Sequence, residues 1–69
     1  MNTLSKRVKQ CRLALNLSQA QLAKKVGMSQ QSMHAIEAGE IQRPRLILEL
    51  AKELNCDPNW LVYGEGNAA

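Results

Sequence analysis

The side chains best suited to recognition chemistry lie between residues 30 and 35. Gln30, Gln31, His34 and Ala35 are spaced so that they share one face of a helix. A glutamine carboxamide both donates and accepts hydrogen bonds, so two adjacent ones can bond to adenine edges in a DNA major groove. Ala35 offers only an apolar contact, for instance with a thymine methyl group. His34 is an uncharged donor, a partly charged phosphate contact or simply an exposed residue, and the sequence leaves these open.

Two short helices joined by a tight turn are predicted over residues 19–37, and the second carries this face. Gly27 marks the turn, because glycine enters a left-handed conformation without a Cβ penalty. Ser18 and Gln21 can form a capping box at the first helix, and Ser29 can cap the second. Apolar residues at helical spacing give the helices inner faces: Leu22, Ala23 and Val26, then Met28, Met33 and Ile36.

Three further helices complete an all-α, five-helix expectation. The first spans residues 3–14 and has the apolar stripe Leu4, Val8, Cys11 and Leu15. The fourth should open at Pro44, whose fixed φ suits the first helical position, and carries a broad apolar face. The fifth should start with Asp57 as cap and Pro58 in the first turn. Residues 1–64 are expected to form one compact domain, followed by a flexible tail at 65–69.

The 69-residue chain has a formal net charge of +3, unevenly distributed. Residues 1–45 carry eight Lys and Arg against two acidic residues, a net +6, while 46–69 carry one Lys against four, a net −3. A basic half that contains the two-helix motif suits a phosphate-facing surface, although ordinary solvated helix faces are an equal alternative.

Enzymatic, metal-binding and membrane roles are not indicated. There is no paired carboxylate cluster, activated nucleophile or phosphate-binding glycine loop, so we expect no enzyme and no cofactor. Cys11, His34 and Cys56 do not have zinc-ligand spacing, and two cysteines are too few for a disulfide framework. No apolar run suggests a signal peptide or a membrane span, so a cytoplasmic protein with reduced thiols is expected.

The motif at 19–37, the RPR at 43–45 and the NCDPNWLVYG at 55–64 resemble the lambdoid-phage Cro and repressor family, most closely its phage 434 members. The resemblance covers nearly the whole chain and implies a lambda-repressor-like domain. It implies base contacts for Gln30 and Gln31, and a phosphate or outermost-base contact for Gln19. It also implies contacts with the DNA backbone or the minor groove for four further polar residues: Ser29, Ser32, Arg43 and Arg45. Of these, Arg45 would lie in the minor groove.

The resemblance further implies an ion pair between Arg12 and Glu37 that holds the first helix against the recognition helix. Cys11 departs from the family, which is basic there, and is interpreted as a boundary residue that is partly exposed. His34 and Ala35 also replace different side chains, so the operator preference does not carry over.

The expected function is a transcriptional repressor that binds a two-fold symmetric operator as a dimer, weakly paired when free. The short chain favours a Cro-type protein over a longer repressor. One alternative is an antitoxin-type regulator that binds a protein toxin as well as its own promoter. A helical interaction module without DNA affinity is another.

Overall fold

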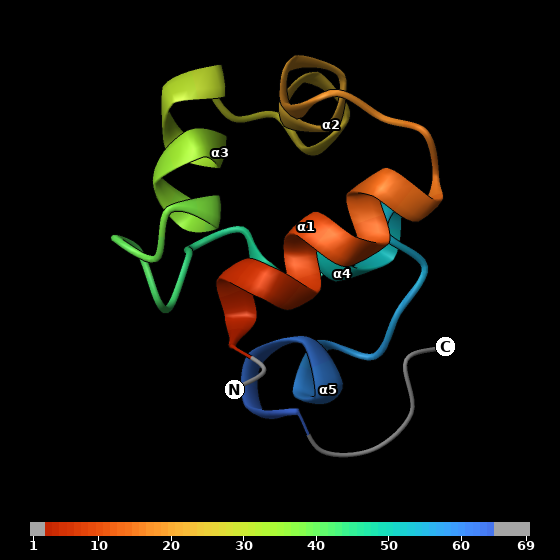
Figure 1. The fold of residues 1–69 in the computed structure, drawn as a ribbon, viewed down its shortest axis with the longest axis vertical. Coiled ribbons are helices and arrows are strands. Elements are labelled where there is room, and N and C mark those ends of the chain that lie inside the picture. Colours follow the sequence, from red (N-terminus) through yellow and green to blue (C-terminus); the bar gives the residue numbers. More distant parts are fainter. Residues whose placement is uncertain (1–2, 65–69) are drawn as a thin grey trace.

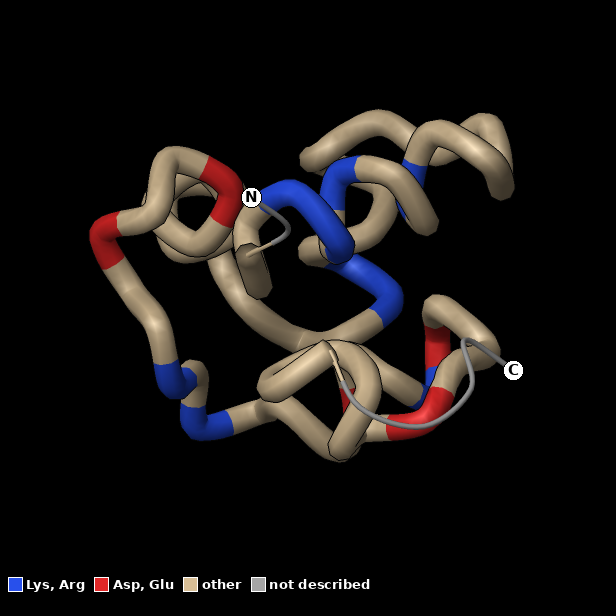
Figure 2. Tube along the Cα trace, turned by 60° about the horizontal axis from the view of Figure 1, so that its bottom comes forward, with Lys and Arg blue, Asp and Glu red and all other residues tan. Residues whose placement is uncertain are grey.

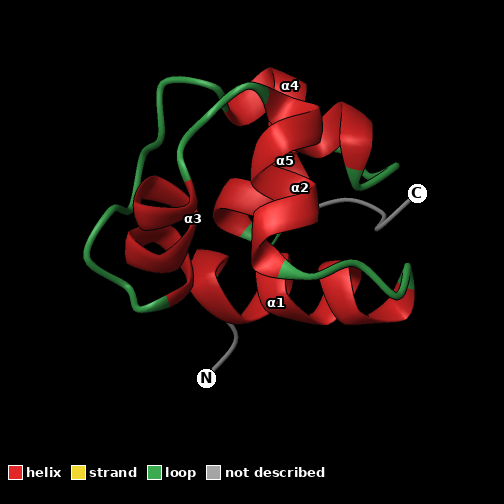
Figure 3. Cartoon of the chain, turned by 90° about the horizontal axis from the view of Figure 1, so that it is seen from above, coloured by secondary structure: helices red, strands yellow, loops and turns green. Residues whose placement is uncertain are grey.

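The computed structural model describes residues 3–64, which form five helices (Figure 1). The predicted tail at 65–69 lies outside these residues. The helices are α1 (Leu4–Ala14), α2 (Gln19–Val26), α3 (Gln30–Glu37), α4 (Ile47–Glu53) and α5 (Pro58–Tyr63). No strand occurs within residues 3–64, so the all-α expectation is confirmed (Figure 3).

The helix boundaries follow local capping signals in the sequence. The Ser18 hydroxyl accepts a hydrogen bond from the Gln21 backbone N–H, and the Gln21 side-chain oxygen accepts one from the Ser18 backbone N–H, which completes the predicted capping box. Ser29 caps α3 by accepting from the Ser32 N–H, and Asp57 caps α5. These side chains satisfy backbone donors that the first helical turn leaves without partners.

The start of α4 differs from the prediction. The helix begins at Ile47, and Pro44 lies three residues earlier, buried in the turn before it. Leu46 stands at the N-cap with φ −97° and ψ 35°, outside the helical region, and no side chain caps the helix. The fixed φ of proline suits a turn as well as a first helical turn, so Pro44 alone could not locate the boundary.

One hydrophobic core joins all five helices. Its largest fully buried side chains come from every helix: Val8, Leu22, Met33, Ile36, Leu50 and Leu61. Helix α1 crosses the middle of the molecule, with α2 and α3 on one side and α5 on the other (Figure 1). Helix α3 is therefore held by its inner face against α1 and α2.

The apolar stripe of α1 ends earlier than predicted. Leu4 and Val8 are buried and Cys11 is half-buried, but Leu15 is 44% exposed. The helix ends at Ala14, and Leu15 takes its C-cap position with φ −92° and ψ 3°. Helical spacing no longer places its side chain on the inner face there, so assigning Leu15 to the stripe was wrong.

Arg7 provides a connection between α1 and α5 that the sequence did not reveal. Its guanidinium is buried, and Nε and Nη2 donate to the carbonyl oxygens of Leu61 and Val62 at 2.8 and 2.9 Å. It also lies 6.0 Å from the centre of the Trp60 ring. These bonds satisfy carbonyls near the end of α5, where a helix has no further donors of its own. Arg7 is thus a structural residue.

Gly27 at the turn between α2 and α3 gives a test of backbone strain alone. Its φ is +90°, and an added Cβ would meet no atom within 4 Å. Gly27→Ala should therefore lower the free energy of unfolding by about 1–2 kcal/mol, because an L-residue is strained in this conformation. Denaturant unfolding checks this, with Gly27→Asn as control, since Asn tolerates the left-handed region better. An Ala variant as stable as the parent would show that the turn does not require glycine.

Candidate nucleic-acid interface

The outer face of α3 carries the predicted recognition residues at its surface. Gln30, Gln31 and His34 are exposed, whereas Met33 and Ile36 on the opposite face are 0% and 1% exposed. Ala35 is half-buried, so it offers only part of its methyl surface. The helix thus presents two carboxamides and an imidazole to solvent, while its opposite face is fixed in the core.

Ser29 and Ser32 are committed to the start of α3. The Ser29 oxygen accepts from the Ser32 backbone at 3.1 Å, and the two hydroxyls are 3.0 Å apart. Each hydroxyl still has bonding capacity left, because a serine oxygen has two lone pairs and one hydrogen. Contact between these two serines and the DNA backbone stays a prediction. Their hydroxyl groups already stabilise the start of α3.

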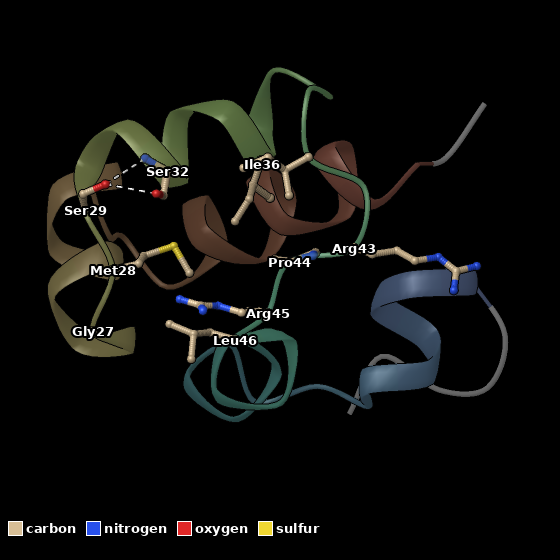
Figure 4. A pocket seen from close by; sticks show the side chains of 10 residues that line it. Gly27, Met28, Ser29, Ser32, Ile36, Arg43, Pro44, Arg45 and Leu46 are labelled. Atoms are coloured by element: carbon tan, nitrogen blue, oxygen red, sulfur yellow. Dashed lines mark hydrogen bonds between the residues drawn. The ribbon is translucent and has the colours of Figure 1, made fainter.

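A hollow of about 430 Å³ lies beside the recognition helix, between its first turns and the loop leading to α4 (Figure 4). The Arg45 side chain extends into this hollow toward Met28 (Figure 4). Arg43 also lines it but points the other way, toward α5, where its guanidinium lies 5.9 Å from the centre of the Tyr63 ring (Figure 4). Arg45 thus extends toward the turn before α3, whereas Arg43 extends toward α5.

The Arg12–Glu37 pair is present and joins α1 to the end of α3. Arg12 Nε and Nη2 donate to the two carboxylate oxygens of Glu37 at 2.6 and 2.9 Å, and Nη1 donates to the Leu17 carbonyl at 2.8 Å. The two side chains are only 9% and 4% exposed. The hydrogen bond to Glu37 raises the pKa of Arg12 and burial opposes the rise, so the guanidinium keeps its charge.

Gln19 belongs to the same network, which the sequence did not indicate. Its amide nitrogen donates to Glu37 Oε1 at 3.2 Å, and the side chain is half-buried. One N–H and the carbonyl oxygen of the carboxamide remain for another partner. A second hollow of about 220 Å³ lies here, lined by Lys9, Arg12, Gln19, His34, Glu37 and Ala38. The predicted DNA contact of Gln19 would thus be made by a side chain already oriented by Glu37.

The Lys and Arg residues lie on the elements around α3, and none lies on α3 itself. Figure 2 shows Lys and Arg on α1, on α2 and in the loop at 43–45, while α3 itself has none. Its acidic residue, Glu37, is neutralised by Arg12. Helix α3 therefore presents uncharged amides, while the Lys and Arg residues belong to neighbouring elements.

None of the helices within residues 3–64 has the length and apolar character needed to cross a bilayer. Over the same residues, no three His, Cys, Asp or Glu side chains gather as metal ligands.

Known proteins resemble this chain in sequence and in structure. The helix-turn-helix family matches residues 8–61. The HTH-type transcriptional regulator PrtR of Pseudomonas aeruginosa is 37% identical over 68 residues, which make up 99% of this chain and 27% of PrtR. The HTH-type transcriptional regulator for conjugative element R391 of Providencia rettgeri is 33% identical over 96% of this chain and 31% of its own length. The chain thus spans less than a third of these curated relatives.

Two solved structures of the P22 c2 repressor match this chain. The P22 c2 repressor in complex with synthetic operator 9T superposes with a TM-score of 0.88 at 30% identity, over 94% of this chain and all of that one. The solution structure of the DNA-binding domain of the P22 c2 repressor superposes with a TM-score of 0.82 at 30% identity. The match covers 100% of this chain and 95% of that domain. Both the match over residues 8–61 and the five-helix arrangement lead to one conclusion. The chain belongs to the helix-turn-helix family and has a lambda-repressor-like all-α fold.

Proposed function

We propose that this chain is a sequence-specific DNA-binding domain of a transcriptional repressor, which inserts α3 into the major groove of an operator. The observation that carries the proposal is the exposed pair Gln30 and Gln31 at the first turn of α3, on a helix whose other face is buried. The two amides would read base edges, with a preference for adenine. The operator complex of the similar P22 c2 repressor supports this.

Phosphate contacts would hold the helix in register. Arg45 lines the hollow beside α3, and we propose that it reaches the minor groove near the operator centre when DNA is bound. A narrow minor groove has an enhanced negative potential, which favours an arginine there. Arg43 would meet a phosphate, since a guanidinium stacked on a ring keeps its N–H edges free. Gln19, Ser29 and Ser32 would contact neighbouring phosphates of the DNA backbone.

Repression would follow from occupancy alone. Two copies would bind two related half-sites with their α3 helices in successive major grooves, about 34 Å apart. A polymerase that needs the same DNA is then excluded by overlap, without a catalytic step. A Cro-type regulator is the form we propose, from the resemblance of residues 43–45 and 55–64 to phage 434 proteins.

The direct experiment is selection of bound duplexes from a random pool, followed by footprinting of the enriched sequence. We expect two-fold related half-sites with centres about one helical turn apart, and protection of backbone on both sides of each major groove. A pool that yields no enriched sequence, or a single unpaired half-site, would contradict the proposal.

Dimerisation should be weak in the absence of DNA. Residues 58–62 expose little apolar surface, because Leu61 is fully buried and Trp60 and Val62 are half-buried. The large exposed side chain at this end is Tyr63, at 59%. A stable interface buries about 800 Å² on each partner, which so few apolar side chains do not supply. Sedimentation should show mostly monomer at micromolar concentration, and a dimer that persists at nanomolar concentration would refute this.

A further inference from the structure

Tyr63 contacts the guanidinium of one of the two loop arginines. It is the last residue of α5, its side chain is 59% exposed, and the Arg43 guanidinium carbon lies over its ring, 5.9 Å from the ring centre. This separation is within the range of a cation–π contact. From the same loop, Arg45 points the other way, toward Met28 (Figure 4).

The backbone that carries the Tyr63 ring is fixed on both sides. Helix α5 packs against α1 and α4. Arg7 of α1 donates hydrogen bonds to the carbonyls of Leu61 and Val62, directly before the ring. Directly after it, Gly64 ends the helix in the left-handed conformation, with φ +77°. The ring is thus presented from a rigid support.

The surroundings of Arg43 hold its side chain less firmly. Arg43 is exposed, in the loop between α3 and α4, and it borders a hollow of about 530 Å³ that Tyr63 also lines. Within residues 3–64 no carboxylate is paired with Arg43, since the ion pair there joins Arg12 to Glu37. Among these residues, Tyr63 is therefore the one whose side chain orients the Arg43 guanidinium.

A guanidinium held over a ring is well prepared to bind phosphate. Its N–H groups project at the edges of its plane, where phosphate oxygens can accept hydrogen bonds while the ring stays in contact. A side chain already fixed in one direction loses less rotamer freedom on binding, which strengthens binding. We propose that Tyr63 is a positioning residue for DNA binding, which holds Arg43 in place for a backbone phosphate. The inference rests on the proposed function, in which Arg43 meets a phosphate.

Loss of the ring should weaken DNA binding without changing the charge of the interface. In Tyr63→Leu, Arg43 still neutralises one phosphate in the complex, so the salt dependence of the affinity should stay nearly unchanged. The affinity should fall about two- to fivefold per subunit, which corresponds to an exposed cation–π contact. The fall should be similar on operator and on random duplex, because a phosphate contact carries no sequence information.

The test is a double-mutant cycle of wild type, Tyr63→Leu, Arg43→Ala and the combined variant. It measures affinity for random duplex and for the selected operator at several salt concentrations. Tyr63→Leu should weaken binding in the wild-type background and have no further effect once Arg43 is alanine. Tyr63→Phe is the matched control and should bind like the wild type, since it keeps the ring. Unfolding temperatures report whether each variant is folded, and Tyr63→Met replaces Tyr63→Leu if the latter is not.

Three results would overturn the proposal. Tyr63→Leu could bind like the wild type while Arg43→Ala weakens binding, which would mean that the ring does not position the arginine. An equal loss with and without Arg43 would mean that Tyr63 acts on DNA by itself. A loss on the full operator but not on random duplex would place the effect of Tyr63 between two copies of the chain.

Failure of the proposed function has a different signature. In that case Arg43→Ala itself leaves both the affinity and its salt dependence unchanged. That result would remove the phosphate contact of Arg43 and, with it, the positioning role of Tyr63.

Discussion

Arg12→Met should lower the free energy of unfolding by about 3–5 kcal/mol, a severe loss for a domain of this size. The substitution leaves the Glu37 carboxylate, 4% exposed, without its cationic partner. It also leaves the Leu17 carbonyl without its donor. An unpaired charge in such a place costs far more than the pair contributed, because its desolvation is no longer compensated.

A double-mutant cycle separates this pairing from simple loss of packing. Arg12→Met combined with Glu37→Leu should recover much of the loss, since no unpaired charge remains. Recovery should be incomplete, because Gln19 and the Leu17 carbonyl also lose partners. Lys9→Met on the same helix is the matched control, with an exposed side chain and an expected effect within about 0.5 kcal/mol. Thermal melts that show additive losses for Arg12 and Glu37 would mean that the two do not interact.

Local signals explain why the helix order and most boundaries were predictable. Ser18, Gly27, Ser29 and Asp57 each act within a few residues of their own position, through a cap or a left-handed turn. The buried face of α3 could also be predicted, because Met33 and Ile36 are three residues apart and so lie on the same side of a helix. Pro44 failed as a signal because its backbone suits both a turn and a helix start.

What the sequence alone could not provide was contact between distant residues. Arg7 looks like one more surface charge until its bonds to Leu61 and Val62 are seen, more than 50 residues away. The Arg12–Glu37 pair was expected only from family resemblance, and the bond from Gln19 to Glu37 was not expected at all. Periodicity and capping carry no information about which polar groups meet across the core, so these contacts required the structure.

The central claim is that Gln30 and Gln31 read bases while the arginines only hold the duplex. Gln30→Ala should cost about 1–3 kcal/mol per half-site on the preferred operator, because a bidentate amide contact discriminates between bases. The effect of Gln30→Ala on binding to random duplex should be small. The slope of the logarithm of the DNA-binding constant against the logarithm of the salt concentration should stay nearly unchanged. Arg43→Ala should weaken both duplexes alike and reduce that slope by about 0.9 per subunit, since one phosphate is no longer neutralised.

The decisive measurement is a salt titration of wild type, Gln30→Ala and Arg43→Ala on the selected operator and on random duplex. Lys52→Ala serves as control, because Lys52 is exposed on α4 in the acidic part of the chain and should change neither affinity nor slope. The predicted result is loss of operator preference in Gln30→Ala at constant slope, and loss of slope at constant preference in Arg43→Ala. If Gln30→Ala weakens both duplexes equally, the outer face of α3 does not read bases and the assignment of the recognition helix is wrong.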